Sequence, residues 1–266
     1  MQEIIGQAPI FIGGAPRSGT TLLRAIVNTS KGIVCGPESR IVPALAALSS
    51  QIEQLHMPVL ERQYGLDADM LHQRFASTIN GFLAPLQAQS GCRIAEKTPA
   101  NILHFTQLRR LFPGSPLVGI VRDGRDVVAS LLTMDWRDAR TGQPLAITRD
   151  PAAAAHLWVE SVEAGAAMRE DPNYFELRYE ALVRHPRDMI AGLFAFLGED
   201  SDAIEAALDH ASTFNPASGA NESSNARVAQ PIDTRAIGRW RAALDASQHD
   251  CVMRIAGPAL SRLGYV

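Results

Sequence analysis

The sequence predicts an α/β protein in which helices flank a parallel sheet. Its 266 residues, 46% hydrophobic and 20% charged, are enough to form one large buried core. Segments with helical spacing separate several short apolar runs, and strands that alternate with helices favour a parallel, doubly wound arrangement. Four runs have the length and the β-branched or aromatic content of buried strands: Pro9 to Gly13, Cys92 to Ala95, Leu117 to Val121 and Tyr174 to Leu177.

Three segments between or after these runs have the spacing of amphipathic helices. Residues 152–170 and 180–197 are rich in alanine and leucine at helical intervals. Residues 19–29 form an apolar face from Leu22, Leu23, Ile26 and Val27. In a parallel sheet, ligands bind beyond the carboxyl ends of the strands. The residues after each strand are therefore the place to look for chemistry.

Segment 41–91 reads as mostly helical, and we expect it to form a helical cap beside the sheet. Its apolar positions include Leu45, Leu48, Ile52 and Leu55. Plain helical packing would explain these positions equally well.

Segment 212–234 is long, polar and rich in Ser, Asn, Pro and Gly. Such a segment inside a compact domain is typical of a lid loop or of disorder. Helical patterns around Trp240 and Ile255 follow it, which favours a lid over a linker between domains. We therefore predict one domain over residues 1–266.

The net charge of −3 and the isoelectric point near 6.2 give no bulk attraction to nucleic acid or to anionic membranes. Cys35, Cys92 and Cys251 are odd in number and lack metal-ligand spacing, so neither a disulfide framework nor a zinc site is expected. The first eight residues are too short and too polar for a signal peptide. The sequence alone thus predicts a cytoplasmic protein that binds no metal.

The first predicted strand leads into Gly14-Ala15-Pro16-Arg17-Ser18-Gly19-Thr20-Thr21 and then into an apolar helix. This order is typical of loops that hold phosphate on backbone N–H groups and on a helix N-terminus. The lysine of a nucleotide triphosphatase loop is absent, and Arg17 supplies the cation instead. Ser18, Thr20 and Thr21 add hydroxyl donors suited to a terminal sulfate or phosphate. The alternatives are a glycine-rich turn without ligand and a variant kinase.

A second anion site is predicted after the strand Leu117 to Val121. If a helix begins near Arg125, Arg122 at the strand end and Ser130 in the second helical turn can converge on another phosphate. Asp123 could imitate the metal-binding acid of a nucleotide triphosphatase, but the loop lysine that would accompany it is missing.

These two elements together resemble those of the sulfotransferases that use 3′-phosphoadenosine-5′-phosphosulfate (PAPS). In that family a loop like Pro16 to Thr21 holds the 5′-phosphosulfate, and an arginine followed eight residues later by a serine holds the 3′-phosphate. The resemblance implies a P-loop-like sulfotransferase fold, PAPS as co-substrate and an acceptor hydroxyl. It also implies that Tyr179 lies against the adenine or its phosphates.

Residues 35–43, Cys-Gly-Pro-Glu-Ser-Arg-Ile-Val-Pro, are similar to the corresponding stretch of the tyrosylprotein sulfotransferases. By that resemblance Glu38 is the general base and Arg40 is its neighbour near the acceptor. Arg17 and Lys97, with Ser224 in the lid, are the candidates for stabilising the leaving oxygen. Without the resemblance, Glu38 reads as a solvated acid paired to Arg40, and Lys97 as a surface lysine.

Some positions depart from the tyrosine-specific pattern. Glu96-Lys97-Thr98-Pro99 resembles a form found among bacterial sulfotransferases of diverse acceptors. Pro37 stands where the tyrosine enzymes often carry an acidic residue, and Gln230 where their lid often carries a lysine. Tyrosine of a peptide or protein is therefore the expected acceptor, with a carbohydrate or small natural product as the alternative. A P-loop kinase and a binding module without turnover are the third and fourth functional hypotheses. Family members can dimerise, but nothing in the sequence specifies a homodimer, and Trp136, Trp158 and Trp240 receive no role.

Overall fold

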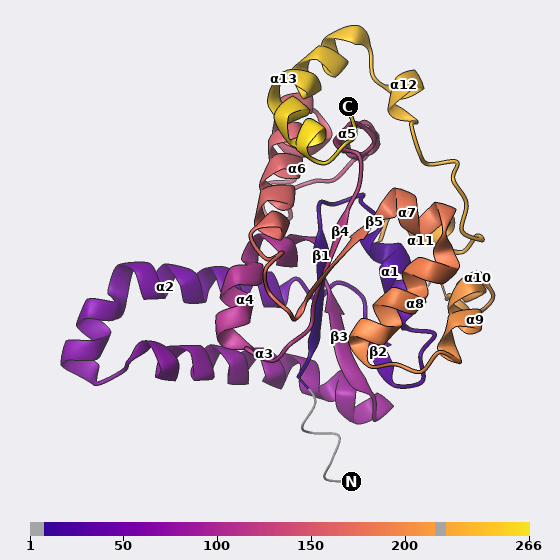
Figure 1. Cartoon of the computed structure of the whole chain (residues 1–266). Helices are drawn as coiled ribbons and strands as arrows, with labels where there is room; N and C mark the ends of the chain where they lie inside the picture. The colour runs from indigo at the N-terminus through magenta and orange to yellow at the C-terminus, as the bar shows by residue number, and fades with distance from the viewer. Residues whose placement is uncertain (1–7, 216–221) are drawn as a thin grey trace.

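A single five-stranded sheet runs through the protein in the order β2-β3-β1-β4-β5, and every pair of neighbouring strands is parallel (Figure 1). The structure is a computed structural model and describes residues 8–215 and 222–266. The strands are β1 (Ile10–Gly14), β2 (Ile33–Cys35), β3 (Arg93–Lys97), β4 (Leu117–Val121) and β5 (Tyr174–Arg178). The predicted parallel sheet flanked by helices is thus confirmed.

Helices cover both faces of the sheet. The principal ones are α1 (Thr20–Val27), α2 (Ile41–Tyr64), α3 (Ala68–Ser90), α4 (Phe105–Leu111), α5 (Gly124–Leu131), α6 (Pro151–Ala166), α7 (Tyr179–Arg184), α8 (Pro186–Leu197) and α13 (Ala246–Arg262). Shorter turns are η2 (Pro99–His104), η3 (Ala146–Thr148), α9 (Ala203–Leu208), α10 (His210–Thr213), α11 (Asn225–Val228) and α12 (Trp240–Ala243). Helices α1 and α8 pack on one face, and η2, α4 and α6 on the other.

The structure differs from the sequence-based prediction at one strand and one helical segment. Strand β2 was not predicted, because a run of only three residues carries too little periodicity to be recognised. Segment 180–197 forms two helices instead of one, and the break falls at His185, where φ is −131° and ψ is 57°. Pro186 lacks an N–H and disfavours helical geometry in the residue before it, so one helix must end there and the next begin.

Helices α2 and α3 form a hairpin that projects from the body of the protein (Figure 1). Its base packs on the sheet through Val42 and Ile79, which share a buried cluster with Phe11. The predicted helical content of 41–91 is confirmed. However, Leu48 and Leu55 are exposed by 45% and 63%, so these two positions are not part of a packed cap. Among the described residues, no helix is both long enough and apolar enough to cross a bilayer.

Candidate active site

Each of the five strands brings one candidate side chain to the carboxyl edge of the sheet. Arg17 follows β1, Glu38 follows β2, Lys97 ends β3, Arg122 follows β4 and Tyr179 follows β5. Strand β1 lies in the middle of the order, next to β3; the connection that leaves β1 runs toward β2 at one edge, whereas the connection that leaves β3 runs in the opposite direction, to β4. Such a switch point leaves a crevice where ligands bind in doubly wound sheets.

The loop between β1 and α1 is shaped by close packing of its backbone. A Cβ at Gly14 would lie 2.5 Å from the carbonyl oxygen of Ile120, so only glycine fits there. Gly19 has a φ of 108°, and a Cβ on it would lie 2.8 Å from the ring of Tyr179. Arg17 also has a positive φ, 74°, although it carries a side chain. A conformation that L-residues avoid is retained where the surrounding structure enforces it, often at functional sites.

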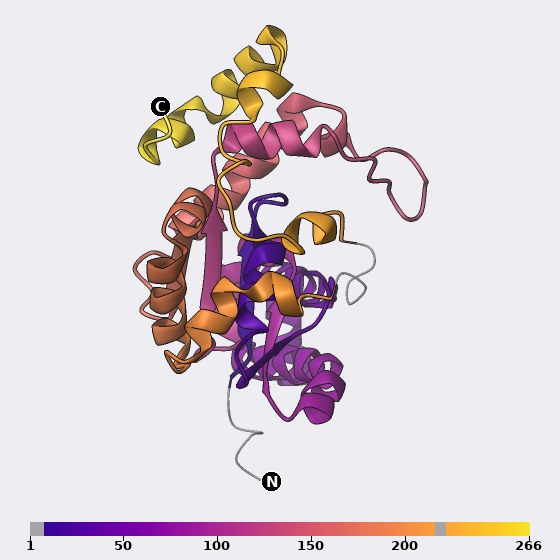
Figure 2. The same cartoon turned by 90° about the vertical axis from the view of Figure 1, so that its right-hand side faces the viewer.

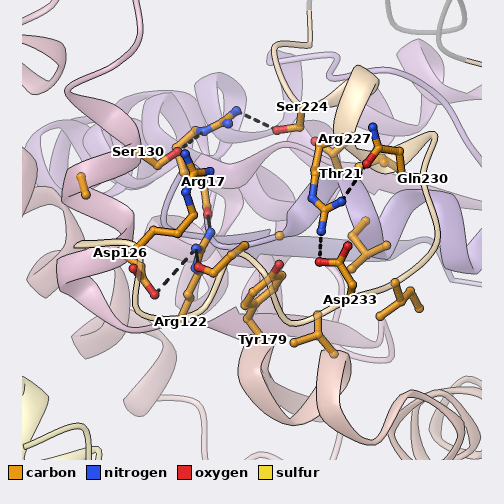
Figure 3. Close-up of a pocket in the computed structure, with 18 of the residues that line it drawn as sticks. Arg17, Thr21, Arg122, Asp126, Ser130, Tyr179, Ser224, Arg227, Gln230 and Asp233 are labelled. Atoms are coloured by element: carbon orange, nitrogen blue, oxygen red, sulfur yellow. Dashed lines mark hydrogen bonds and ion pairs between the residues drawn. The ribbon is translucent and has the colours of Figure 1, made fainter. Parts of the chain in front are cut away.

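The guanidinium of Arg17 joins the loop to two distant parts of the chain (Figure 3). Its Nε donates to Ser130 Oγ at 3.0 Å, and its Nη1 donates to Ser223 Oγ and Ser224 Oγ at 2.8 and 2.7 Å. Burial, followed by repulsion from Arg122 and Arg239, lowers the pKa of Arg17. Three guanidiniums that approach one another in this way create a local positive field that favours a multiply charged anion.

The residues of the predicted second anion site lie together around the start of α5. Asp123 caps the helix by accepting from the Arg125 N–H, and Arg125 in turn binds Asp123 at 2.8 Å. Asp123 is therefore held by its own neighbour. Arg122 Nη1 donates to the Arg17 carbonyl oxygen at 3.0 Å, so Arg122, Arg17 and Ser130 form one connected cluster. The two anion sites predicted from separate motifs are contiguous.

A cavity of about 340 Å³ opens beside this cluster (Figure 3). The Arg122 guanidinium lies over the Tyr179 ring at 4.5 Å from its centroid, and burial raises the pKa of the Tyr179 hydroxyl. Arg227 and Asp233 form an ion pair on the opposite wall, next to Gln230. Arg227 thus brings a guanidinium to the wall where Gln230 replaces the expected lysine. Cationic and aromatic groups together suit a nucleotide that carries several phosphates.

A second cavity, of about 580 Å³, lies on the other side of the loop. Glu38 and Arg40 line it from the segment after β2, and Thr98 and Pro99 from the segment after β3. Trp136, which received no role from the sequence, lines a third side. The wall is therefore part apolar and part charged, with the Arg40 side chain 76% exposed and the Glu38 side chain 19% exposed.

The two cavities share four lining residues: Arg17, Gly19, Thr21 and Ser224. A group bound in one cavity therefore reaches a group bound in the other across the phosphate loop. This is the arrangement needed to pass a small charged group between two ligands in one step.

Lys97 is wholly buried behind this junction, with no exposed side-chain surface. Its Nζ contacts Glu38 Oε1 at 2.8 Å and Glu222 Oε2 at 2.9 Å. A buried ammonium is stable only with such partners. The reading of Lys97 as a surface lysine is therefore wrong, and Glu38 is an acid paired mainly to Lys97, since Arg40 Nε lies 3.8 Å away.

Glu96, the residue before Lys97, organises the loop that carries Glu38. Its buried carboxylate accepts from Ser39 Oγ at 2.8 Å, Thr98 Oγ1 at 2.7 Å and Asn101 Nδ2 at 2.6 Å. Thr98 Oγ1 also accepts from the backbone N–H of Arg40, whose φ is 56°. The Glu96 to Thr98 run therefore ties the end of β3 to the turn between β2 and α2.

Most of the predicted site residues lie at this junction, but two do not face a cavity. The second cavity is lined by Pro16, Thr20 and the four shared residues. Ser18 lines neither cavity and is fully buried. Its Oγ has no hydrogen-bond partner within the described residues. Lys97 reaches the junction only through Glu38 and Glu222.

Sequence reasoning missed three contributors: Glu222, Asp126 and Arg239. Asp126 accepts from the backbone N–H groups of Gly238 and Trp240 at 2.7 and 2.9 Å, which anchors the chain after the lid. The position of Asp126 at the end of the Arg122-Asp123-Gly124-Arg125-Asp126 run could have marked it as a site residue. No comparable signal marks Glu222, whose partners are more than 100 residues away in sequence.

The described part of the segment 212–234, predicted to be a lid, lies against the first cavity. We call residues 222–236 the lid segment, and several of them line the first cavity. Figure 2 shows the chain from α11 to α12 running past the sheet toward the C-terminal helices. Positions 216–221 of the predicted lid lie outside the described residues. Within residues 8–215 and 222–266, no three or more His, Cys, Asp or Glu side chains gather as metal ligands.

Comparison with known proteins places this geometry in context. The model of the Sulfotransferase family matches residues 9–203. Protein-tyrosine sulfotransferase 1 of Danio rerio is 30% identical over 267 residues, which cover 96% of this chain and 72% of the relative. Protein-tyrosine sulfotransferase 2 of Gallus gallus is 29% identical, and the match covers 96% of this chain and 69% of the relative.

Among solved structures, the sulfotransferase domain from the Synechococcus PCC 7002 olefin synthase has a similar fold. It superposes with a TM-score of 0.62 at 23% identity, and the match covers 94% of each chain. At this level of identity the similarity concerns the fold alone.

Proposed function

Because the chain belongs to the sulfotransferase family, we propose that it transfers the sulfuryl group of PAPS to an acceptor hydroxyl, with tyrosine of a peptide or protein as the acceptor. The observation that carries the proposal is the junction of two cavities at Arg17, Gly19, Thr21 and Ser224. One cavity has the cations for a nucleotide with several phosphates, and the other carries a carboxylate for an acceptor.

The residues around the first cavity fit PAPS. Thr21, which lines both cavities, lies at the N-terminus of α1 beside Thr20 of the second cavity, and the two hydroxyls suit the 5′-phosphosulfate at the junction. Arg122 with Ser130 suits the 3′-phosphate. The Tyr179 ring, which lies under Arg122, suits the nucleoside side of the ligand. A nucleotide triphosphate offers no 3′-phosphate for the second cluster, which favours PAPS over ATP or GTP. When bound, PAPS supplies the sulfuryl group and a phosphate oxygen as the leaving atom.

The roles of the protein groups follow from their positions. Glu38 faces the second cavity and takes the proton of the acceptor hydroxyl, so that the acceptor oxygen can bond to sulfur as the bond from sulfur to the phosphate oxygen breaks. Arg17 and Ser224 at the junction, with Lys97 behind it, stabilise the charge that moves to the leaving oxygen. A phenol with a pKa of about 10 is easier to deprotonate than a sugar alcohol, which suits a carboxylate base.

The second cavity supports a peptide acceptor. Its wall combines Trp136 and Pro99, which can pack against an aromatic ring, with the exposed guanidinium of Arg40. The matches to relatives named protein-tyrosine sulfotransferases cover 96% of this chain. A carbohydrate or small natural product is the alternative acceptor for the same machinery.

The test is to incubate the protein with PAPS and a panel of tyrosine peptides, simple phenols and sugars, and to identify products by mass spectrometry. Glu38→Gln is expected to lower transfer by about 100-fold or more, as removal of a general base does. The matched control is Glu205→Gln, because Glu205 is an exposed carboxylate in α9 paired to Arg187. Sulfated sugar without sulfated tyrosine would overturn the acceptor. Binding of ATP with magnesium in preference to 3′-phosphoadenosine-5′-phosphate (PAP) would overturn the sulfotransferase.

A cytoplasmic location stays a prediction. The thiols of Cys35, Cys92 and Cys251 are free, which supports a reducing compartment.

A further inference from the structure

The first described residues of the lid segment lie directly on the phosphate loop. Ser223 and Ser224 bind Arg17, and Glu222 reaches past them to three groups from two other elements. Glu222 Oε2 accepts from Thr21 Oγ1 at 3.0 Å and from Lys97 Nζ at 2.9 Å, while Glu222 Oε1 lies 3.4 Å from Arg24 Nη1. Helix α1, strand β3 and the lid segment are therefore joined at one carboxylate.

Charge in this buried cluster is balanced. Glu38 and Glu222 are the two carboxylates, and Lys97 and Arg24 are the two cations whose side chains are 0% and 2% exposed. Burial tends to raise the pKa of Glu222, but the charges of Lys97 and Arg24 and the hydrogen bonds from Lys97 and Thr21 hold it below its ordinary value. Buried charges of this kind are stable only as a complete set, because each one otherwise lacks compensation.

The two carboxylates on Lys97 differ in what they can do. Glu222 Oε2 accepts two hydrogen bonds, Glu222 Oε1 faces the Arg24 guanidinium as an ion pair, and the side chain is 8% exposed. Glu38 has one oxygen on Lys97, while the other is 3.8 Å from Arg40 and the side chain is 19% exposed toward the second cavity. Glu38 is therefore the one available to an acceptor proton, and Glu222 is the one that holds the other groups in place.

We propose that Glu222 is a positioning residue that fastens the lid segment onto the phosphate loop and holds Lys97 beside Glu38. This role rests on the proposed sulfuryl transfer, and it adds a link between the two halves of the site. The lid segment lines the first cavity through Ser224, Arg227 and Val228, while Glu222 at its start holds the lysine that pairs with the base. Closure over the nucleotide and alignment of the base are thus one structural event.

The decisive variant is Glu222→Gln, which keeps the shape of the side chain and an acceptor for Thr21 but removes the charge. We expect kcat to fall by about 10- to 100-fold, as displaced catalytic groups do, and PAP to bind more weakly, because the lid segment that lines the first cavity is held less firmly. Glu222→Asp, which keeps the charge on a shorter chain, is expected to restore part of the loss. Glu205→Gln again serves as the control, and circular dichroism melting checks that each variant is folded.

A double-mutant cycle with Lys97→Met tests whether Glu222 acts through Lys97. In the Lys97→Met background, Glu222→Gln should cost less than about threefold in kcat, because the group that it positions is already gone. Equal losses with and without Lys97, or no loss in either, would overturn the proposal. Tighter PAP binding together with a higher kcat/KM in Glu222→Gln would also overturn it, because Glu222 would then be a competitor of the nucleotide.

Hydrogen–deuterium exchange separates this proposal from the function on which it rests. Peptides that cover 222–236 should exchange faster in Glu222→Gln than in the wild-type protein, with or without PAP, whatever the acceptor proves to be. If the wild-type protein sulfates nothing in the panel but the lid segment is released in the variant, the function fails and the fastening role stands. Unchanged exchange alongside normal sulfation would reject the fastening role alone.

Discussion

Arg17 Nε donates to Ser130 Oγ at 3.0 Å, and this bond joins a loop near the N-terminus to a helix 113 residues later. The loop after β1 and the start of α5 are two separate anion-binding motifs in sequence. In the folded protein they form a single cationic wall, because β1 and β4 are neighbours and their carboxyl ends lie side by side. A ligand with phosphates at two positions can therefore bridge them.

This relationship predicts how PAP and AMP, which lacks the 3′-phosphate, are discriminated. Arg122→Met should weaken PAP binding by about 10- to 100-fold, since a charge-assisted hydrogen bond is worth about 1.5–3 kcal/mol. AMP binding should change much less. Ser130→Ala should weaken PAP binding by about tenfold or less. Isothermal titration calorimetry measures the affinity of each of the two variants for PAP and for AMP. If Arg122→Met lost the same affinity for both nucleotides, Arg122 would not contact the 3′-phosphate.

Two substitutions of Arg40 should have the same effect on peptide binding but different effects on protein stability. Its φ is 56°, its side chain is 76% exposed, and its backbone N–H is held by Thr98. Arg40→Gly and Arg40→Ala should raise KM for acidic tyrosine peptides to a similar degree, since both remove the guanidinium. The glycine variant should be more stable than the alanine variant by about 1 kcal/mol, because only glycine adopts this conformation without strain. Urea unfolding would refute the prediction if both variants were equally stable.

Replacement of Glu96 should lower both the stability and the activity of the protein. In Glu96→Gln, the amide must present an N–H₂ group either to Ser39 and Thr98 or to Asn101, which are themselves donors. We expect the free energy of unfolding to fall by about 1–3 kcal/mol, the cost of an unsatisfied buried group. Activity should fall as well, because the turn that carries Glu38 loses its support. Glu61→Gln, at an exposed position of α2, is the control and should change neither quantity.

Cys35 predicts both thiol reactivity and a pH dependence. Burial, and secondarily the charge of Glu96, raises the pKa of Cys35 to about 12 from an ordinary value of 9.0. At about pH 8 iodoacetamide should alkylate the half-buried Cys92 and Cys251 before Cys35. Labelling of Cys35 at the same rate would contradict its burial.

The sign of the pH effect follows from proton binding. The folded protein holds the Cys35 proton more tightly than the unfolded chain, so the stabilisation is complete below about pH 9 and is lost as pH rises toward 12. From about pH 8 to about pH 11, the wild-type protein should therefore lose more stability than Cys35→Ala. Urea unfolding at several pH values measures this difference.

The sequence by itself determined the fold class and located the two candidate anion-binding motifs. Four of the five strands, the loop 14–19 and the turn 122–126 were predictable because hydrophobic period and turn chemistry act over a few neighbouring residues. Strand β2 and the break before Pro186 show the limits of local pattern, since a three-residue strand is formed by its partner β3 and not by its own propensity. The general positions of Glu38 and Arg40 came from resemblance.

Only the tertiary structure decided which charged side chains meet. Lys97 lies between Glu38 and Glu222, which are 59 and 125 residues away in sequence, and Arg17 binds serines of the lid segment 206 and 207 residues away. No local pattern encodes such pairs, because they depend on strand order and on how the chain returns across the sheet. Their strength also depends on burial, which removes water and makes each buried charge require a partner. The local sequence therefore placed the groups that we propose bind phosphate, and the fold supplied the buried charges beside them.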